Sequence, residues 1–253
     1  MTIAILSTGD ELTHGDTLNT TSQILAHALS TAGFPMGMHM VCGDKEQELF
    51  DGIAFLALHH KVVIITGGLG PTSDDRTRFA LAKYLNIDLI SYPDVLIHIE
   101  QCLKAVNLRL NTALMLNAGQ ETQALFPENA VLFENPYGTA WGCAYEQGEQ
   151  LFILLPGPPK ECVPMFENHA LLYLKQKLTP SDKICLKWQL FGVPEGSTSE
   201  KLEEALAGIP CQVGYRLDRS DTPYLEFKVR CGKAWVSRVK EIIEPMAKAH
   251  SAH

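Results

Sequence analysis

The stretch that decides the fold is residues 62–77, Val62-Val63-Ile64-Ile65-Thr66-Gly67-Gly68-Leu69-Gly70-Pro71-Thr72-Ser73-Asp74-Asp75-Arg76-Thr77. Its opening run of Val and Ile predicts a strand that is buried on both faces, as in a parallel sheet. The glycines that follow tolerate positive φ and let the backbone approach a ligand closely. Asp74 and Asp75 then precede an amphipathic run at helical spacing, which predicts that a helix begins at these acids.

A strand, a glycine turn and a helix N-terminus form an arrangement that holds phosphate on backbone N–H groups and on the helix dipole. Two carboxylates at that turn would repel phosphate unless a divalent cation bridges them to it. We therefore interpret Asp75 as a candidate metal ligand and Asp74 as a residue near the substrate. The alternative is that Asp74 is only the helix cap and Asp75 only a first-turn residue that favours the dipole.

Further acids follow two other predicted strands. Residues 2–8 predict a strand that ends at Gly9-Asp10-Glu11, and residues 36–42 predict a strand that ends just before Asp44. In open α/β sheets, ligands bind in the crevice beyond the carboxyl ends of the strands. These acids are thus placed to share a site with Asp75. Turn formation, solvation and helix capping are their alternative roles.

The elements through residue 86 alternate strand and helix, which is the doubly wound α/β pattern. A helix is predicted over residues 93–118, and a hairpin is predicted at 141–146 and 150–155. The hairpin leads into Pro156-Gly157-Pro158-Pro159, a second turn where glycine permits close approach. Residues 135–140, which include Gly138 and Thr139, either line the same crevice or form an ordinary loop.

A linker is predicted at residues 179–182, which divides the chain into an α/β domain over 1–178 and a small α+β domain over 182–253. The small domain has the predicted order βαββα, and Ser197-Thr198-Ser199-Glu200 predicts a capping box at the start of its first helix. Its last strand has one polar face, made by Tyr224, Glu226, Lys228 and Arg230. That face predicts packing on the large domain or self-association as a homodimer.

The composition is that of an ordinary globular protein, with 46% hydrophobic residues in a chain of 253. The net charge of −8 disfavours nonspecific nucleic-acid binding. No apolar run is long enough to span a membrane, and the N-terminus does not look like a signal peptide, so a cytoplasmic location is expected. The seven cysteines lie far apart and predict free, reduced thiols.

The opening stretch, taken with Gly9-Asp10-Glu11-Leu12, Gly43-Asp44, Gly138-Thr139-Ala140 and Leu155-Pro156-Gly157-Pro158-Pro159, resembles the N-terminal region of the CinA (competence/damage-inducible) proteins. That region is similar to the molybdopterin-binding fold of the MogA and MoaB type. The resemblance implies a three-layer α/β/α domain around a mostly parallel sheet. Full-length members often continue into a deamidase domain that acts on nicotinamide mononucleotide, and this chain is expected to lack that domain.

The resemblance also implies two classes of ligand. One is a dinucleotide such as ADP-ribose, cleaved at its pyrophosphate with a divalent metal, and the other is a phosphorylated pterin such as molybdopterin. Acids that match Asp44 and Asp75 matter in the molybdopterin-type relatives. One family segment that commonly reads Asn-Arg-Lys-Gln is Gln120-Glu121-Thr122-Gln123 here. The two cations it lacks would stabilise charge on a transferring phosphoryl group.

The function expected from the sequence is metal-dependent nucleotide pyrophosphatase activity on ADP-ribose-like dinucleotides. The alternative is binding of molybdopterin or another pterin phosphate without hydrolysis. The candidate catalytic residues are Asp10, Asp44 and Asp75, and the candidate ligands of Mg, Mn or Co are Asp10, Glu11, Asp44 and Asp75. The candidate substrate-binding residues are Gly67, Gly68, Gly70, Thr72, Asp74, Thr77, Gly138, Thr139 and Gly157.

Overall fold

The computed structural model describes residues 2–219 and 223–248. The chain divides into two compact units between Thr179 and Pro180, which lie in the predicted linker. Each unit has its own hydrophobic core. Among the described residues, no helix combines the length and the apolar character that a membrane crossing requires.

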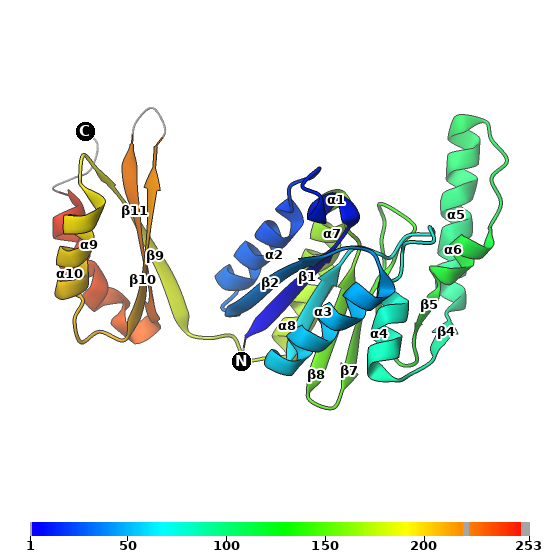
Figure 1. Ribbon diagram of the computed structural model, residues 1–253, viewed down its shortest axis with the longest axis horizontal. Helices are drawn as coiled ribbons and strands as arrows, with labels where there is room; N and C mark the ends of the chain where they lie inside the picture. Colours follow the sequence, from blue (N-terminus) through cyan, green and yellow to red (C-terminus); the bar gives the residue numbers. More distant parts are fainter. Residues whose placement is uncertain (1, 220–222, 249–253) are drawn as a thin grey trace. The chain divides into compact units, whose positions relative to one another are not determined.

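The first unit is built on a six-stranded sheet of order β2-β1-β3-β8-β7-β6 (Figure 1). The strands β2, β1, β3 and β8 are parallel, whereas β7 and β6 run antiparallel to their neighbours. The bounds of these strands are β1 Ile3–Thr8, β2 Met36–Cys42, β3 Val62–Thr66, β6 Val131–Phe133, β7 Gly142–Gln147 and β8 Gln150–Leu155. The predicted mostly parallel sheet and the predicted 141–155 hairpin are thereby confirmed.

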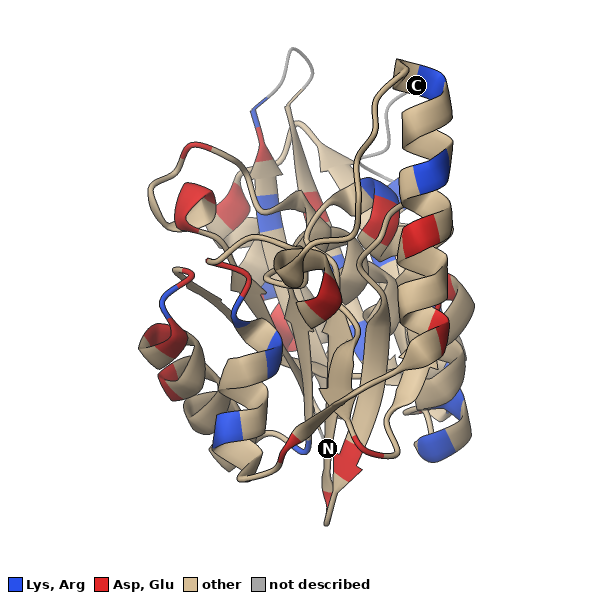
Figure 2. Cartoon of the chain, turned by 90° about the vertical axis from the view of Figure 1, so that its right-hand side faces the viewer, with Lys and Arg blue, Asp and Glu red and all other residues tan. Residues whose placement is uncertain are grey.

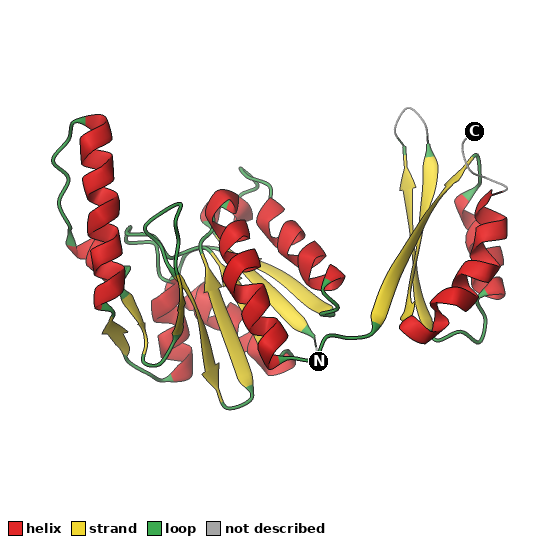
Figure 3. Cartoon of the chain, turned by 180° about the vertical axis from the view of Figure 1, so that it is seen from behind, coloured by secondary structure: helices red, strands yellow, loops and turns green. Residues whose placement is uncertain are grey.

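Helices cover both faces of this sheet, because alternate residues of its strands point to opposite sides. Along β3, Val63 and Ile65 pack with one core cluster, and Val62 and Ile64 pack with the other. The first cluster includes helices α3 (Glu46–His59), α4 (Thr77–Leu85) and α5 (Pro93–Leu110). The second includes α2 (Thr20–Thr31), α7 (Pro159–Met165), the π-helical segment Phe166–Ala170 and α8 (Leu171–Lys177). Figure 3 shows the resulting three layers.

Helix α5 is shorter than predicted. The pattern predicts a helix over 93–118, but α5 ends at Leu110 because Asn111 adopts a left-handed conformation with φ of 50°. A separate short helix, α6, follows over Ala118–Thr122. The first turn of α5 carries Asp94 and its last turn carries Arg109, a charge order that favours the helix dipole. Figure 2 shows the acidic residues of the chain in red and the basic residues in blue.

Three short elements complete the first unit. A helical turn, α1 (Asp10–Thr13), follows β1, and it begins at the acids that the sequence places beyond that strand. A separate two-stranded sheet pairs β4 (Leu89–Ser91) with β5 (Leu125–Pro127) in antiparallel orientation. The sequence pattern does not predict this small sheet, because three-residue strands carry too few residues to display a period.

The second unit has the predicted βαββα order. Its sheet has the order β10-β11-β9, with β9 Lys183–Phe191, β10 Cys211–Asp218 and β11 Tyr224–Gly232. Helices α9 (Glu195–Ala205) and α10 (Val236–Lys248) supply Leu202, Val239 and Ile243 to the core on one face. The predicted polar face of β11 is confirmed, since its residues alternate between half-buried and buried. The predicted capping box is wrong: α9 begins two residues earlier than Ser197, after Pro194.

Candidate functional site

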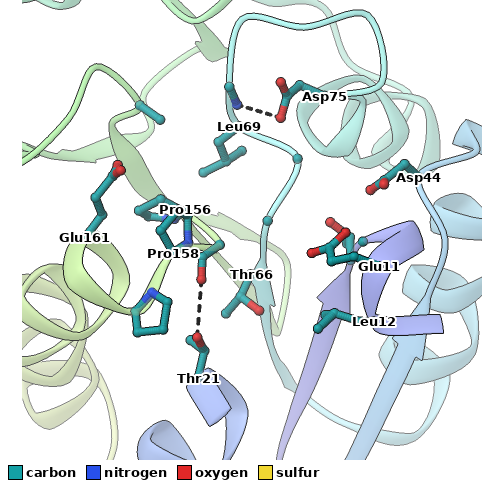
Figure 4. Close-up of a pocket in the computed structure, with 18 of the residues that line it drawn as sticks. Glu11, Leu12, Thr21, Asp44, Thr66, Leu69, Asp75, Pro156, Pro158 and Glu161 are labelled. Atoms are coloured by element: carbon teal, nitrogen blue, oxygen red, sulfur yellow. Dashed lines mark hydrogen bonds between the residues drawn. The ribbon is translucent and has the colours of Figure 1, made fainter. Parts of the chain in front are cut away.

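A cavity of the first unit lies where strands β1, β3 and β8 end. Its volume of about 640 Å³ is within the range of small-molecule sites. Strand β1 lies between β2 and β3 in the sheet, so the chain crosses from one side of β1 to the other after β2. The cavity therefore lies at the topological switch point of the sheet. Its walls are lined by residues within 8–12, 17–21, 66–75, 138–140 and 156–161, together with Asp44 and Gln123 (Figure 4).

The glycine loop, residues 66–75, turns its first carbonyl groups toward the protein. The Gly67 carbonyl accepts from the Thr77 hydroxyl at 2.8 Å, and the Gly68 carbonyl accepts from the Thr77 N–H at 3.3 Å. Gly67 and Gly68 have φ of 102° and 65°, a region that favours glycine. Thr77 is fully buried, so this predicted substrate-binding residue shapes the loop from behind the cavity wall.

A buried cation lies beneath the same loop. The Arg78 guanidinium donates to the Leu69 carbonyl at 3.0 Å and to the Gly70 carbonyl at 3.4 Å. The side-chain amide of Gln123, which is fully buried, donates to the same Leu69 carbonyl at 3.2 Å. Burial lowers the pKa of Arg78 to about 10, and the charge of Asp75 opposes that shift. All four carbonyls of residues 67–70 are therefore bound by the protein.

Sequence reasoning missed Arg78 and Gln123. Arg78 reads as an ordinary helical arginine, and nothing in its spacing indicates that it is 1% exposed. Gln123 belongs to the segment that departs from the family pattern, and the structure gives it a role as a buried support of the loop. A polar side chain beneath a glycine-rich turn has no sequence signal of its own, because the tertiary fold alone brings it there.

The N–H groups of the glycine loop are only partly hydrogen-bonded among the described residues, unlike the carbonyls of residues 67–70. Gly67 donates to the Leu155 carbonyl at 3.0 Å, and Gly70 donates to Asp75 at 2.7 Å. The N–H groups of Gly68 and Leu69 have no acceptor within the described part of the chain. Both residues line the cavity, and successive N–H groups in such turns form anion-binding concavities. These two N–H groups are therefore the candidates in the loop for binding an anionic ligand.

The Asp75 carboxylate accepts hydrogen bonds from the C-terminal part of the glycine loop. It accepts from the N–H of Gly70 at 2.7 Å and from the N–H of Thr72 at 2.9 Å, and it also accepts from the Thr72 hydroxyl. The predicted helix start at Asp74 and Asp75 is wrong: helix α4 begins at Thr77 after Arg76. Asp75 therefore neither caps the helix nor lies in its first turn, because its carboxylate closes the 70–75 turn instead.

Asp10 and Asp44 face each other at the ends of β1 and β2. The Asp44 carboxylate accepts from the N–H of Asp10 at 2.9 Å, and the Asp10 carboxylate accepts from the N–H of Asp44 at 3.2 Å. Gly43 makes this pairing possible, since a Cβ there would lie 2.6 Å from an Asp10 carboxylate oxygen. Burial raises the pKa of Asp44, and the charges of Asp10, Glu11 and Asp74 raise it further against the opposing hydrogen bond from Asp10.

The carboxylates of Glu11 and Asp44 lie together on one side of the cavity, and Asp75 is turned toward its own loop (Figure 4). Within the described residues, no three His, Cys, Asp or Glu side chains gather closely enough to hold a metal ion. Magnesium is commonly bound by one or two carboxylates together with substrate phosphates and water. Glu11 and Asp44 are therefore the candidate residues of this cavity for an ion of that kind.

The second turn, Pro156–Pro159, packs directly against the glycine loop. A Cβ on Gly157 would lie 3.4 Å from the Cα of Gly67, so the two turns approach at backbone distance. The Gly157 carbonyl accepts from the hydroxyl of Thr21 on α2 at 3.2 Å. Gly157 therefore permits close packing of the turns, and Thr21 is a wall residue that is not among the predicted site residues.

Glu161 is a further cavity residue that sequence reasoning missed. It lies on α7, and its carboxylate accepts from the Nδ2 of Asn135 at 2.7 Å. A Cβ on Gly138 would lie 2.4 Å from a Glu161 carboxylate oxygen, so the predicted substrate-binding glycine leaves room for this carboxylate. The pattern around Pro158-Pro159 signals only a turn and a helix start, and Glu161 reads there as a first-turn acid.

The cavity brings together most of the predicted site residues. Those that line it are Glu11, Asp44, Gly67, Gly68, Gly70, Asp74, Asp75, Gly138, Thr139 and Gly157. Asp10, Thr72 and Thr77 are outside its lining and hold the segments that form it. The described lining contains five carboxylates, Glu11, Asp44, Asp74, Asp75 and Glu161, and no Lys, Arg or His side chain.

Comparison with known proteins agrees with the fold of the first unit. A family model described as "Probable molybdopterin binding domain" matches residues 4–176. A solved structure, the protein CinA with unknown function from Thermoplasma acidophilum, matches with a TM-score of 0.59 and 27% identity. That match covers 70% of this chain and 96% of the other chain.

Two curated relatives are described as competence-damage inducible proteins. The one from Alkaliphilus metalliredigens is 38% identical over 210 residues, which cover 82% of this chain and 49% of the relative. The one from Alkaliphilus oremlandii is 34% identical over 253 residues, which cover 97% of this chain and 57% of the relative. These matches confirm the resemblance to CinA proteins, and the chain spans about half the length of the curated relatives it matches.

Proposed function

Because the chain belongs to the molybdopterin-binding domain family, we propose that its cavity binds a phosphorylated small molecule together with a divalent metal ion. The proposed reaction is hydrolysis of the pyrophosphate bond of an ADP-ribose-like dinucleotide. The phosphate would lie on the N–H groups of Gly68 and Leu69, which have no acceptor in the described chain. The buried charge of Arg78 beneath them favours an anion at that place.

One observation carries this proposal: the cavity combines backbone donors for an anion with a wall of carboxylates and no cationic side chain among its described lining residues. A phosphate entering alone would be repelled by these carboxylates. When a phosphate enters with a divalent ion, the backbone N–H groups can bind the phosphate and the carboxylates can bind the ion. The acids and the glycine loop then have complementary roles in one binding event.

The residues proposed to hold the ion are Asp44 and Glu11, with Asp10 as the residue that orients Asp44. The reciprocal hydrogen bonds between Asp10 and Asp44 fix the position of the Asp44 carboxylate, which is half-buried. A divalent ion held there would polarise a phosphoryl oxygen and lower the pKa of bound water. Asp75, predicted as a catalytic residue and metal ligand, is assigned to loop closure because its contacts are with its own loop.

The second candidate function is binding of molybdopterin or a related pterin phosphate without hydrolysis. The family match favours it. The absence of a lysine or arginine among the described wall residues also favours it, since no side-chain cation is available to stabilise charge on a transferring phosphoryl group. The glycine loop and the pair of Asp44 and Glu11 would serve the pterin phosphate in the same way.

A hydrolysis screen separates the two functions. ADP-ribose and related dinucleotides would be incubated with the protein and Mg, Mn or Co, and release of AMP would be followed by chromatography. We expect metal-dependent AMP release that is lost in Asp44→Asn. Metal-dependent ligand binding without AMP release would favour the pterin-binding function. No binding of any phosphorylated compound with any ion would contradict both.

We also propose that the chain forms a homodimer. The end of α5 and the segment after it expose four large apolar side chains, Leu108, Leu110, Leu114 and Met115, which are 51–87% exposed. Grouped exposed apolar residues are characteristic of protein contact sites. A second copy of this chain is the expected occupant. Sedimentation equilibrium at micromolar concentration should give the dimer mass, and a monomer mass throughout would contradict the proposal.

A further inference from the structure

Glu161 has no part in the phosphate and metal binding proposed above. Figure 4 shows it on one side of the cavity, with Glu11 and Asp44 on the other side and the glycine loop between them. It is half-buried, and among the described residues no Lys, Arg or His forms an ion pair with it. A carboxylate held in a cavity wall without a cation needs other hydrogen-bond donors.

Asn135 fixes the position of this carboxylate. Asn135 is fully buried, and its Nδ2 donates both to the Ala140 carbonyl at 2.9 Å and to Glu161 at 2.7 Å. Its Oδ1 accepts from the N–H of Tyr137 at 3.0 Å. Asn135 thus remains tied to its own loop by two contacts that do not involve Glu161. The loop does not require Glu161 for its shape, whereas Glu161 requires Asn135 for its orientation.

The carboxylate retains most of its capacity to accept hydrogen bonds. An ionised glutamate offers about four acceptor positions, and the described side-chain contacts of Glu161 fill one of them. Gly138 keeps the adjacent space clear, because a side chain at that position would collide with the carboxylate. The remaining positions are available to a ligand that presents two adjacent donors.

We propose that Glu161 recognises the organic part of the ligand by accepting two adjacent O–H or N–H groups. This inference rests on the proposed function, since it assumes that the phosphate end lies on the glycine loop. Two sources present such a donor pair: the vicinal hydroxyls of a terminal ribose, and the adjacent N–H groups on the 2-amino-4-oxo edge shared by guanine and pterins. An adenine edge offers an acceptor beside its donor and does not match a carboxylate.

The test is binding of matched ligands to the parent and to Glu161→Gln, measured by calorimetry with Mg²⁺ present. Glutamine preserves the size of the side chain and an oxygen for Asn135, but it replaces one acceptor with a donor. The matched control is Glu167→Gln, an exposed glutamate on the adjacent π-helical segment. The ligands are inorganic pyrophosphate, the pair ADP-ribose and ADP, with ADP-ribose supplied as its non-hydrolysable methylene analogue, and the pair GDP and IDP.

We expect Glu161→Gln to weaken one ligand of a pair by about ten- to hundredfold, as for loss of hydrogen bonds to a charged group. Weaker binding of ADP-ribose but not of ADP would show that Glu161 binds the hydroxyls of the terminal ribose. Weaker binding of GDP but not of IDP would show that Glu161 binds the 2-amino-4-oxo edge. Pyrophosphate should bind unchanged or more tightly, because the variant removes a negative charge. Glu167→Gln should match the parent.

Unchanged binding of all ligands, or an equal loss that includes pyrophosphate, would overturn the role of Glu161. If the parent binds GDP or ADP-ribose but not pyrophosphate, the phosphate site fails, and the selective loss in Glu161→Gln still supports the carboxylate's role. If the parent binds none of these ligands, both proposals are overturned. The two proposals therefore fail in distinguishable ways.

Discussion

Two carboxylates of the same cavity, Asp75 in the glycine loop and Asp44 beyond β2, are surrounded in opposite ways. Asp75 accepts two backbone N–H groups and a hydroxyl, and a buried guanidinium lies beneath its loop. Asp44 accepts one backbone N–H from Asp10. Burial and three neighbouring acids raise the pKa of Asp44, although that hydrogen bond opposes the shift.

We interpret Asp75 as a carboxylate that stabilises the fold, and we propose that Asp44 is a carboxylate that binds a ligand. Asp75 has its hydrogen bonds satisfied within the protein, so its removal should disturb the loop. Asp44 carries unfavourable charge in the folded state, and folded proteins accept such groups chiefly where function requires them. Substitution of Asp75 should therefore reduce stability more than ligand binding, and substitution of Asp44 should reduce ligand binding more than stability.

The largest loss of stability should come from the glycine loop in Gly68→Ala. Gly68 has φ of 65°, and a Cβ there would lie 2.2 Å from the Thr77 hydroxyl and 3.3 Å from the Thr77 backbone nitrogen. Left-handed strain and overpacking together should lower the free energy of unfolding by about 3 kcal/mol or more. Urea denaturation followed by circular dichroism measures this change.

The matched control for Gly68→Ala is Gly148→Ala in the β7–β8 hairpin. Gly148 has a similar φ of 60°, but a Cβ there would meet nothing within 4 Å. This variant should lose only the strain contribution, about 1–2 kcal/mol. Equal losses in the two variants would mean that close packing of the loop on Thr77 contributes nothing.

The next largest effect should be that of Asp75→Asn, which removes one acceptor oxygen from the 70–75 turn. Asparagine cannot accept from both Gly70 and Thr72 with separate carboxylate oxygens, so one N–H loses its partner. The free energy of unfolding should fall by about 2 kcal/mol. Asp74→Asn, at an exposed neighbouring position, should leave it nearly unchanged. A fully stable Asp75→Asn protein would remove the distinction between the two carboxylates.

Asp44→Asn should show the opposite behaviour. The asparagine oxygen can still accept from the N–H of Asp10, and the repulsion from the neighbouring acids is relieved. Stability should be unchanged or slightly higher, while binding of the phosphorylated ligand with Mg²⁺ weakens by at least about tenfold. Loss of an outer contact to a metal site already has that effect. Calorimetry gives the affinity, and a marked loss of stability without a change in binding would reverse the assignment.

The smallest effect should be a pH dependence of stability from Asp44. Its pKa is raised in the fold above the ordinary value of 3.8, so the folded state binds more protons between these two values. The stability that Asp44 contributes is therefore present below 3.8 and is lost as pH rises through the raised pKa. Comparing unfolding of the parent and Asp44→Asn from acid to neutral pH should show this step only in the parent.

Metal binding has the opposite pH dependence, because a proton on Asp44 competes with the ion. Ligand affinity measured with Mg²⁺ should fall on acidification at a higher pH than an ordinary aspartate would give. A midpoint at or below 3.8 would show that Asp44 does not contact the ion.

Periodicity and turn residues were sufficient to predict most of the architecture, although not the small β4–β5 sheet. The Val and Ile run of β3, the 141–155 hairpin and the βαββα order of the second unit were all found where they were expected. Element ends were less predictable. Asp75 has the character of a helix N-terminal residue, but the tertiary contacts of Arg78 and Thr77 hold the chain in a turn until residue 77.

The site was predictable in part for a physical reason. Acids and glycines at the ends of parallel strands must meet at one edge of the sheet, so Asp44 and Gly67 could be placed together. The side chains that support the loop from beneath could not be predicted. Arg78 and Gln123 are 45 residues apart in the chain and meet only through folding. Glu161 was missed for the same reason, since Asn135 that orients it comes from another segment.

The central claim is that the cavity binds phosphate only together with a divalent ion. The most direct measurement is calorimetric titration of the protein with a non-hydrolysable methylene analogue of ADP-ribose, first with Mg²⁺ and then with EDTA. Binding with Mg²⁺ and its loss with EDTA is the predicted result, because five carboxylates and no cationic side chain line the described cavity wall. Equal affinity in the presence of EDTA, or no binding with any divalent ion, would contradict the claim.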